Sequence, residues 1–165
     1  MIQIRPFARA PAPACRPIGP ERSAECALIH AASFAHPWDE ADFEQLLTKP
    51  EIVAAGAIEI RDEMLAGFVL TRVALDEAEI LTITVAAERR RRGVGATLLS
   101  THLRTLAARD VRRLFLEVDA ENFAAQALYA GRGFHQVAER KAYYRRGDSP
   151  PASAIVMRLD LPGRS

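Results

Sequence analysis

The stretch that decides the fold is Ile80-Leu81-Thr82-Ile83-Thr84-Val85, and Arg90-Arg91-Arg92-Gly93-Val94-Gly95 follows it after four residues. The first run is rich in β-branched residues, which predicts a strand, and apolar residues at helical spacing begin at Val94. Glycines at a helix start allow a ligand to approach the backbone, and the free N–H groups there carry a partial positive charge. The order of strand, glycine loop and helix therefore predicts an anion site, with a plain chain-reversing turn as the alternative.

The composition is typical of a folded globular domain. The chain has 165 residues, of which 49% are hydrophobic and 26% are charged, so one domain with a sizeable core is expected. The formal net charge of +1 gives no overall attraction to nucleic acid, and no nucleic-acid partner is expected. Anion binding has to come from a local cluster such as the arginines at 89–92, whose alternative is an ordinary solvated surface.

Two further features indicate a reducing, aqueous compartment. Cys15 and Cys26 form neither a metal-ligand pattern nor a disulfide framework, so both thiols are expected to be free and no metal is predicted. The first twenty residues contain several prolines and no continuous apolar run. The sequence therefore predicts no signal peptide, no transmembrane helix and no membrane partner, and a cytoplasmic protein is expected.

Hydrophobic periodicity and turn residues divide the rest of the chain into elements. Residues 1–13 are interpreted as an extended or mobile arm, and a first strand is predicted either at 2–7 or at 14–18. Helices are predicted at 21–34 and 39–47, with Asp39 as the cap of the second, before antiparallel strands at 52–60, 65–73 and 79–85. The next helix has Val94, Leu98, Leu99, Leu103 and Leu106 on one face, and it precedes a strand at 113–118, a helix at 122–130 and strands at 136–144 and 153–161. This order predicts an α/β (α+β) sandwich with helices on both faces of the sheet.

Four phrases, in this order within residues 14–161, resemble the GCN5-related N-acetyltransferase (GNAT) superfamily: Ile83-Thr84-Val85, Arg90-x-x-Gly93-x-Gly95, Leu116-Glu117-Val118 and Asn122-x-x-Ala125-x-x-Leu128-Tyr129-x-x-x-Gly133-Phe134. Within the superfamily, His36-Pro37-Trp38, Leu75-Asp76-Glu77-Ala78 and Tyr143-Tyr144 resemble the RimI group, which acetylates the N-terminal alanine of a small-subunit ribosomal protein. The resemblance implies a single domain over 14–165. Its sheet is expected to be mixed and mostly antiparallel, with a splayed pair of parallel strands.

The resemblance also implies acetyl-CoA as the acetyl donor, bound between the two splayed strands. The backbone of Ile83, Thr84 and Val85 is expected to hold the thioester and the pantetheine arm. The pyrophosphate is expected on the loop formed by Arg91, Arg92, Gly93, Val94, Gly95 and Ala96. Asn122 is expected to contact the cofactor, and its residue type also suits a helix N-cap.

Glu117 and Tyr129 are the expected general base and general acid of a direct transfer in a ternary complex. Strand alternation places Glu117 on the face of Phe115, opposite Leu114, Leu116 and Val118. Burial there is expected to raise the pKa of Glu117 into the working range of a base, with a solvent-facing glutamate as the alternative. Tyr129 is expected to be protonated at pH 7 and to donate to the departing thiolate, with a core aromatic as the alternative. Glu79, on the preceding strand, is a second possible base.

The acceptor implied by the resemblance is the α-amino group of a peptide or protein, with alanine first. An α-amino group has a pKa of about 8, against about 10.4 for lysine, so one carboxylate deprotonates it more easily. Trp38 and Tyr144 are expected to line the peptide entrance, with a core position as the alternative for Trp38. Asp119 and Arg145-Arg146 depart from the group's pattern, so a small-molecule amine acetyltransferase or a non-catalytic acyl-CoA-binding protein are the alternative functions. The oligomeric state is not predicted.

Overall fold

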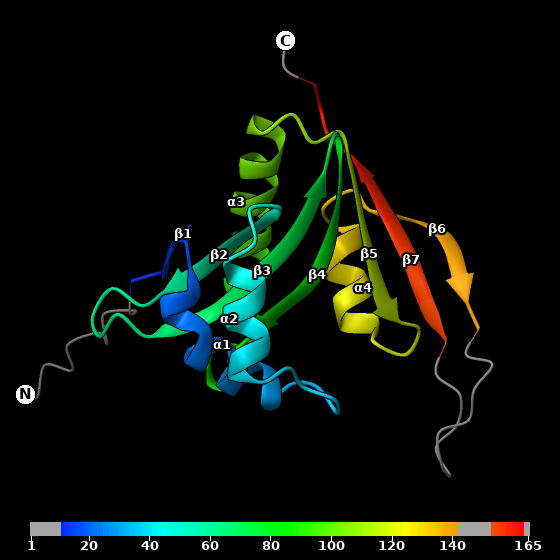
Figure 1. Ribbon diagram of the computed structural model, residues 1–165. Helices are drawn as coiled ribbons and strands as arrows, with labels where there is room; N and C mark the ends of the chain where they lie inside the picture. The colour runs from blue at the N-terminus through cyan, green and yellow to red at the C-terminus, as the bar shows by residue number, and fades with distance from the viewer. Residues whose placement is uncertain (1–10, 142–152, 164–165) are drawn as a thin grey trace, which may run out of the picture.

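The computed structural model describes residues 11–141 and 153–163, and its framework is a seven-stranded sheet in the order β1-β2-β3-β4-β5-β7-β6 (Figure 1). Neighbouring strands are antiparallel except β4 and β5, which run parallel. The strands are β1 (Ala14–Pro17), β2 (Ile52–Ile58), β3 (Leu65–Ala74), β4 (Glu77–Val85), β5 (Arg113–Asp119), β6 (His135–Arg140) and β7 (Ala154–Asp160). The mixed, mostly antiparallel sheet predicted from the sequence is confirmed.

Helices cover the two faces of the sheet as separate layers. In Figure 1, α1 (Ser23–Ala31) and α2 (Glu40–Leu47) lie in front of the sheet, and α3 (Val94–Ala108) and α4 (Phe123–Ala130) lie behind it. The short 3-10 helices η1 (Pro20–Arg22) and η2 (Ala87–Arg89) come before α1 and α3. Because β4 and β5 are parallel, the loops that lead into α3 and α4 leave the sheet at the same edge, which is where a ligand can touch both.

Two helix starts follow from their capping residues, as predicted. The Asp39 carboxylate accepts a hydrogen bond from the Asp42 amide at 2.9 Å, and the Asp42 carboxylate accepts one from the Asp39 amide at 3.0 Å. Asn122 Oδ1 accepts a bond from the Ala125 amide at 3.1 Å at the start of α4. These side chains satisfy amides that a helix start otherwise leaves unpaired.

The helix predicted at 21–34 is shorter in the structure. Its first residues form η1, and α1 ends at Ala31, because the amides of Ser33 and Phe34 both bond to the His30 carbonyl and close the helix with a turn. The first strand is β1, within the predicted 14–18, whereas the alternative at 2–7 lies outside the described residues. The other boundaries agree to within two residues, except that the end predicted for β6 also lies outside the described residues.

A β-bulge divides β4 into two parts. Thr71 of β3 is opposite Ile80, whereas Leu70 is opposite Thr82, so Leu81 has no partner on β3. Ile80 packs into the cluster beneath α3, whereas Thr82 lies on the face of Leu70, which packs against α1 and α2. Because of the extra residue, Ile80 and Thr82 face opposite sides of the sheet although they are two residues apart. A regular two-residue alternation along the sequence would place them on the same side.

Two apolar clusters, one on each face, form the core. The cluster beneath α3 and α4 contains the helix face predicted from the sequence, with one correction: the side chain fully buried in the third turn is His102, whereas Leu103 is partly buried. His102 Nε2 and Thr71 Oγ1 are 2.8 Å apart, and this bond lets a polar ring pack inside the cluster. The cluster beneath α1 and α2 is centred on Cys26, Phe43 and Phe68.

Candidate active site

The loop that leads into α3 has the backbone geometry of an anion site. Gly93 caps the helix with φ 77° and ψ 7°, a left-handed conformation that favours glycine, and Arg91 is also left-handed at φ 60°. The first bond of this helix start runs from the Thr97 amide to the Gly93 carbonyl at 3.0 Å, so the amides of residues 94–96 have no acceptor within the helix. No acidic residue occupies the first turn of α3. Positive potential at this helix start is therefore available to a ligand.

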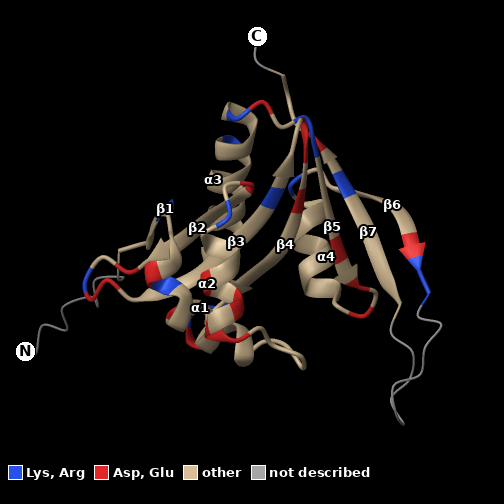
Figure 2. Cartoon of the chain, in the orientation of Figure 1, with Lys and Arg blue, Asp and Glu red and all other residues tan. Residues whose placement is uncertain are grey.

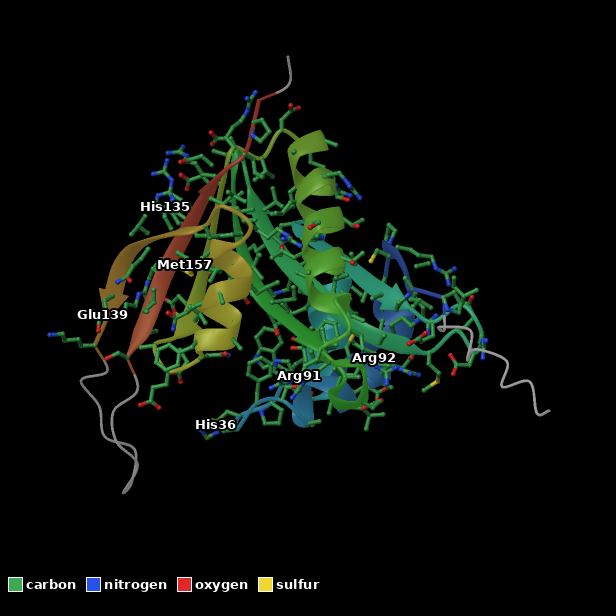
Figure 3. All side chains as sticks on the ribbon, turned by 180° about the vertical axis from the view of Figure 1, so that it is seen from behind. His36, Arg91, Arg92, His135, Glu139 and Met157 are labelled. Carbon is green, nitrogen blue, oxygen red and sulfur yellow. The ribbon has the colours of Figure 1, made fainter. Side chains whose placement is uncertain are left out.

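The four arginines at 89–92 have different contacts. Arg89 pairs with Glu59 of the β2–β3 turn, with Nε and Oε1 3.0 Å apart, and the exposed Arg90 donates to two hydrogen-bond acceptors. Within the described part of the chain, Arg91 and Arg92 have no hydrogen-bond or ion-pair partner, and both are exposed. Figure 3 shows them at the base of α3, at the same end of the molecule as His36. Two guanidinium groups are thus free to meet an anion at the helix start.

Open space adjoins this loop. A cavity of about 610 Å³ lies beside the start of α3, with Arg92, Gly93 and Thr97 on one wall and Cys15 and Glu59 on the other. Its lining includes residues of β1 and β2 and none of β4 or β5. A Cβ atom added at Gly93 would meet no atom within 4 Å, so the glycine is needed for its left-handed backbone and not to make room for neighbouring atoms in this structure. The loop is accessible from solvent.

The parallel pair β4–β5 is splayed, as predicted. The two strands pair only from Glu77–Ile80 with Arg113–Leu116. Beyond Ile80, β4 keeps its pairing with β3 and β5 keeps its pairing with β7, so the strands separate from each other. Among the described residues, the β5 side of Ile83–Val85 has no strand partner, which leaves backbone groups there for an extended ligand. Thr82 and Thr84 are buried, and their hydroxyl oxygens are 3.4 Å apart.

The expectation that Glu117 is buried is wrong. Its side chain is 41% exposed, and its Oε1 lies 2.8 Å from Nε of Arg140 on β6. Alternation along β5 is as predicted, because Leu114, Leu116 and Val118 pack into the cluster beneath α3 and α4. Glu117 therefore lies on the opposite face, at the splayed end of β5, where no helix is packed over it in Figure 1. The carboxylate is open to water.

Glu79 lies on the same face, one step along the sheet. Glu79 pairs in the parallel register with Phe115, and Phe115 is two residues before Glu117 on β5. The Glu79 side chain is exposed. Its position is inside the paired part of β4 and β5, whereas Glu117 is beyond it. The geometry therefore brings Glu117, rather than Glu79, to the open end of the strand pair.

Tyr129 lies on the other side of the sheet, in α4. Its side chain is 7% exposed, and its ring packs against Phe134 with centroids 5.7 Å apart. Burial raises the pKa of Tyr129 to about 12, because the tyrosinate would lose its hydration. The phenol is therefore protonated throughout the physiological pH range. The ring therefore belongs to the core, as the alternative interpretation held, and the hydroxyl keeps its proton at pH 7; the role as general acid stays a prediction.

Trp38 belongs to an aromatic cluster at the segment between α1 and α2. The buried His30 ring stacks on Phe34 and Trp38, at centroid distances of 4.3 and 5.0 Å, and Phe43 lies edge-on to both His30 and Trp38. The Trp38 amide donates to His30 Nδ1 at 3.1 Å, so Nδ1 carries no proton and the imidazole is neutral. Burial lowers the pKa of His30, which also favours the neutral ring. Trp38 is partly buried and lines a hollow of about 440 Å³ with Leu28 and Pro37. Tyr144 lies outside the described residues.

Sequence reasoning missed several residues that organise the site. His30 fixes Trp38, Arg140 pairs with Glu117, and Arg132 of the α4–β6 turn donates from Nε to Ser100 Oγ of α3 at 2.8 Å. The Arg140–Glu117 and Arg132–Ser100 contacts join distant parts of the chain, and no local spacing predicts them. The spacing of His30, Phe34 and Trp38 by four residues was the one available signal, because a helical period extended past Ala31 places the three on one side.

Charge is mixed over the molecule. In the view of Figure 2, acidic and basic residues are interspersed on the strands and helices rather than gathered on one side. Over residues 11–141 and 153–163, no helix is both long and apolar enough to span a bilayer. In the same residues, no three His, Cys, Asp or Glu side chains are grouped to hold a metal ion.

Known proteins share this fold and much of this sequence. Residues 21–134 match the model of the acetyltransferase (GNAT) family. The [ribosomal protein bS18]-alanine N-acetyltransferase of Escherichia coli strain K12 is 35% identical over 133 residues, which cover 81% of this chain and 87% of the relative. The Salmonella typhimurium protein of the same name is 40% identical over 100 residues, which cover 61% of this chain and 67% of the relative.

Solved structures agree with the sequence matches. The crystal structure of the ribosomal-protein-S18-alanine N-acetyltransferase from Escherichia coli superposes with a TM-score of 0.82 at 30% identity. The superposition covers 92% of this chain and 96% of that one. The layered sheet and the loop before α3 therefore belong to a fold that occurs in a known enzyme.

Proposed function

Because the chain belongs to the acetyltransferase (GNAT) family, we propose that it transfers an acetyl group from acetyl-CoA to the α-amino group of a protein N-terminus. The observation that carries the proposal is the open end of the β4–β5 pair, which has an anion site at one border and a solvent-accessible carboxylate at the other. The proposed acceptor is the N-terminal alanine of a small-subunit ribosomal protein, because relatives of this length are named for bS18.

The donor is proposed to bind along the splay. The pyrophosphate would take the amides of residues 93–96 and the charges of Arg91 and Arg92, and the pantetheine arm and thioester would bond to the backbone of Ile83–Val85. Asn122 is proposed to touch the donor as well as cap α4. This arrangement requires few special side chains, because backbone donors supply most of the contacts.

Glu117 is proposed as the general base, acting through water. It takes a proton from the substrate ammonium, and the free amine attacks the thioester carbonyl carbon. An α-amino group is about 2.4 pKa units more acidic than a lysine side chain, so its deprotonation costs about 3 kcal/mol less. A single exposed carboxylate therefore suits an N-terminus better than an internal lysine.

Tyr129 is proposed as the proton donor to sulfur. The C–N bond forms as the C–S bond breaks, the nitrogen releases its surplus proton to water, the sulfur gains the phenolic proton, and the tyrosinate then regains a proton from solvent. Transfer from a group with a pKa of about 12 to a thiolate of ordinary pKa near 8.5 is uphill by about 5 kcal/mol. The hydroxyl therefore acts first as a hydrogen-bond donor to the developing charge, and the same apolar surroundings raise the thiol pKa toward that of the donor.

A substrate panel tests the proposal. Short peptides with a free N-terminal alanine, the same peptides with a blocked N-terminus and an internal lysine, and a set of polyamines and aminoglycosides are each incubated with acetyl-CoA. We expect turnover of the free N-termini and none of the blocked peptides. Turnover of polyamines or aminoglycosides alone would identify a small-molecule acetyltransferase, and acetyl-CoA binding without any turnover would identify a non-catalytic acyl-CoA-binding protein.

A further inference from the structure

Arg90 connects two loops that lie far apart in the sequence. Its Nε donates to the Val85 carbonyl at 3.0 Å, and its Nη2 donates to Ser33 Oγ at 2.9 Å. Ser33 Oγ in turn donates to the Ile29 carbonyl at 2.9 Å. A hydroxyl has one donor and two acceptor sites, so Ser33 serves both partners at once. The result is a continuous chain of hydrogen bonds from the end of β4 to the last turn of α1.

Both ends of this connection belong to the proposed reaction. Val85 ends the backbone run proposed to hold the acetyl donor, and the loop that follows contains the anion site. Ser33 lies in segment 32–39, named here the acceptor loop, whose Trp38 is fixed to α1 through His30. Figure 3 places His36 of the acceptor loop and Arg91 of the donor side at the same end of the molecule.

The neighbouring arginines show that this contact is specific to Arg90. Arg89 pairs with Glu59 on the other side of the loop, and Arg91 and Arg92 have no partner among the described residues. Arg90 alone is directed from this run toward the α1–α2 side. It does so through two directional bonds from one planar group, which fixes the orientation of the guanidinium as well as its position.

We propose that Arg90 is a positioning residue that couples the donor site to the acceptor loop. This inference rests on the proposed function. A donor that orders the loop between Val85 and Gly93 also orders Arg90, and through Ser33 it orders the acceptor loop. The acceptor therefore binds more tightly once the donor is in place, and the coupling is lost when either end of the Arg90–Ser33 bond is removed.

Trp38 offers a readout that does not depend on the acceptor. It is the single tryptophan of the chain and lies on the acceptor loop. CoA is titrated into the wild type and into Ser33→Ala, Ser33→Thr and Arg90→Gln, and binding is followed by calorimetry and by Trp38 fluorescence. We expect CoA to bind wild type and Ser33→Ala with the same affinity within about twofold. Trp38 emission should respond in the wild type and in Ser33→Thr, which keeps the hydroxyl, and not in Ser33→Ala or Arg90→Gln.

Kinetics give the second readout. At saturating acetyl-CoA, Ser33→Ala should raise the KM for the acceptor peptide about fivefold, which corresponds to about 1 kcal/mol and is ordinary for one solvent-exposed hydrogen bond. The double variant of Ser33 and Arg90 should be no worse than Arg90→Gln alone, because Arg90→Gln already removes the bond that Ser33→Ala removes. Arg61→Gln, an exposed arginine in the β2–β3 turn, is the matched control and should change neither value.

The outcomes separate the coupling from the proposed function. An unchanged Trp38 response in Ser33→Ala with CoA bound would overturn the coupling, and so would additive effects on the acceptor KM. Absence of heat on CoA titration would overturn the proposed function together with the coupling, and only calorimetry would report it. If Ser33→Ala lowers the melting temperature but its Trp38 emission change per bound CoA equals that of the wild type, the Arg90–Ser33 bond is merely structural. That outcome would also reject the proposal.

Discussion

His102 should make the protein less stable in mild acid. The imidazole is fully buried in α3, bonded through Nε2 to Thr71, and among the described residues its Nδ1 has no partner. Burial lowers its pKa from 6.5 to about 4, with the charge of Arg109 as a smaller cause. The unfolded chain therefore binds a proton near pH 6.5, and the folded chain does so only near pH 4. Between these values the unfolded state holds more protons, so the free energy of unfolding decreases as the pH decreases.

The gap of about 2.5 pKa units corresponds to about 3 kcal/mol once both states are protonated, and to about 2 kcal/mol at pH 5. The assay is urea unfolding of the wild type and of His102→Gln, each near pH 8 and near pH 5. Glutamine can keep a bond to Thr71 and has no proton to gain, so the wild type should lose about 2 kcal/mol more than the variant. Burial also lowers the pKa of His30, but that group titrates in both proteins and cancels in the difference. An equal loss in the two proteins would refute the assignment.

Three further predictions concern the site. Gly93→Val should weaken acetyl-CoA binding by about 1–3 kcal/mol in calorimetry, because the left-handed φ of 77° strains a β-branched residue, whereas Gly95→Ala meets only ordinary contacts and should bind nearly as wild type. Glu117→Gln should lower kcat by about 10² to 10⁴ with acetyl-CoA binding intact, and full activity there with loss in Glu79→Gln would move the base to β4. Tyr129→Phe should lower kcat by a similar factor, and an unchanged rate in this variant would remove the acid role from the phenol.

Local patterns were sufficient where local physics decides the structure. Asp39 and Asn122 were predicted as caps because their side chains satisfy amides within three residues, and the structure contains both bonds. Gly93 was predicted at a helix start, and its left-handed conformation agrees. Alternation along β5 correctly assigned Glu117 to the face opposite Leu116.

Predictions that depended on packing were less successful. Alternation tells which face a residue is on but not whether another layer covers that face, and Glu117 proved exposed and paired with Arg140. His102 was missed because its acceptor, Thr71, belongs to a distant strand. The bulge at Leu81 depends on the pairing of two strands, and a β-branched run alone contains no trace of it.

The short pairing of β4 with β5 has a mechanical consequence. β1 to β4 form one antiparallel block and β5, β7 and β6 form another, and the seam between the blocks is only four residue pairs long. At one end of the seam Arg113 forms ion pairs with Asp76 and Glu77. Behind the seam, Arg132 after α4 donates a hydrogen bond to Ser100 of α3. A donor hydrogen-bonded to both strands where β4 and β5 are unpaired would connect the two blocks. Occupancy of the proposed site would then increase the cohesion of the two halves of the molecule.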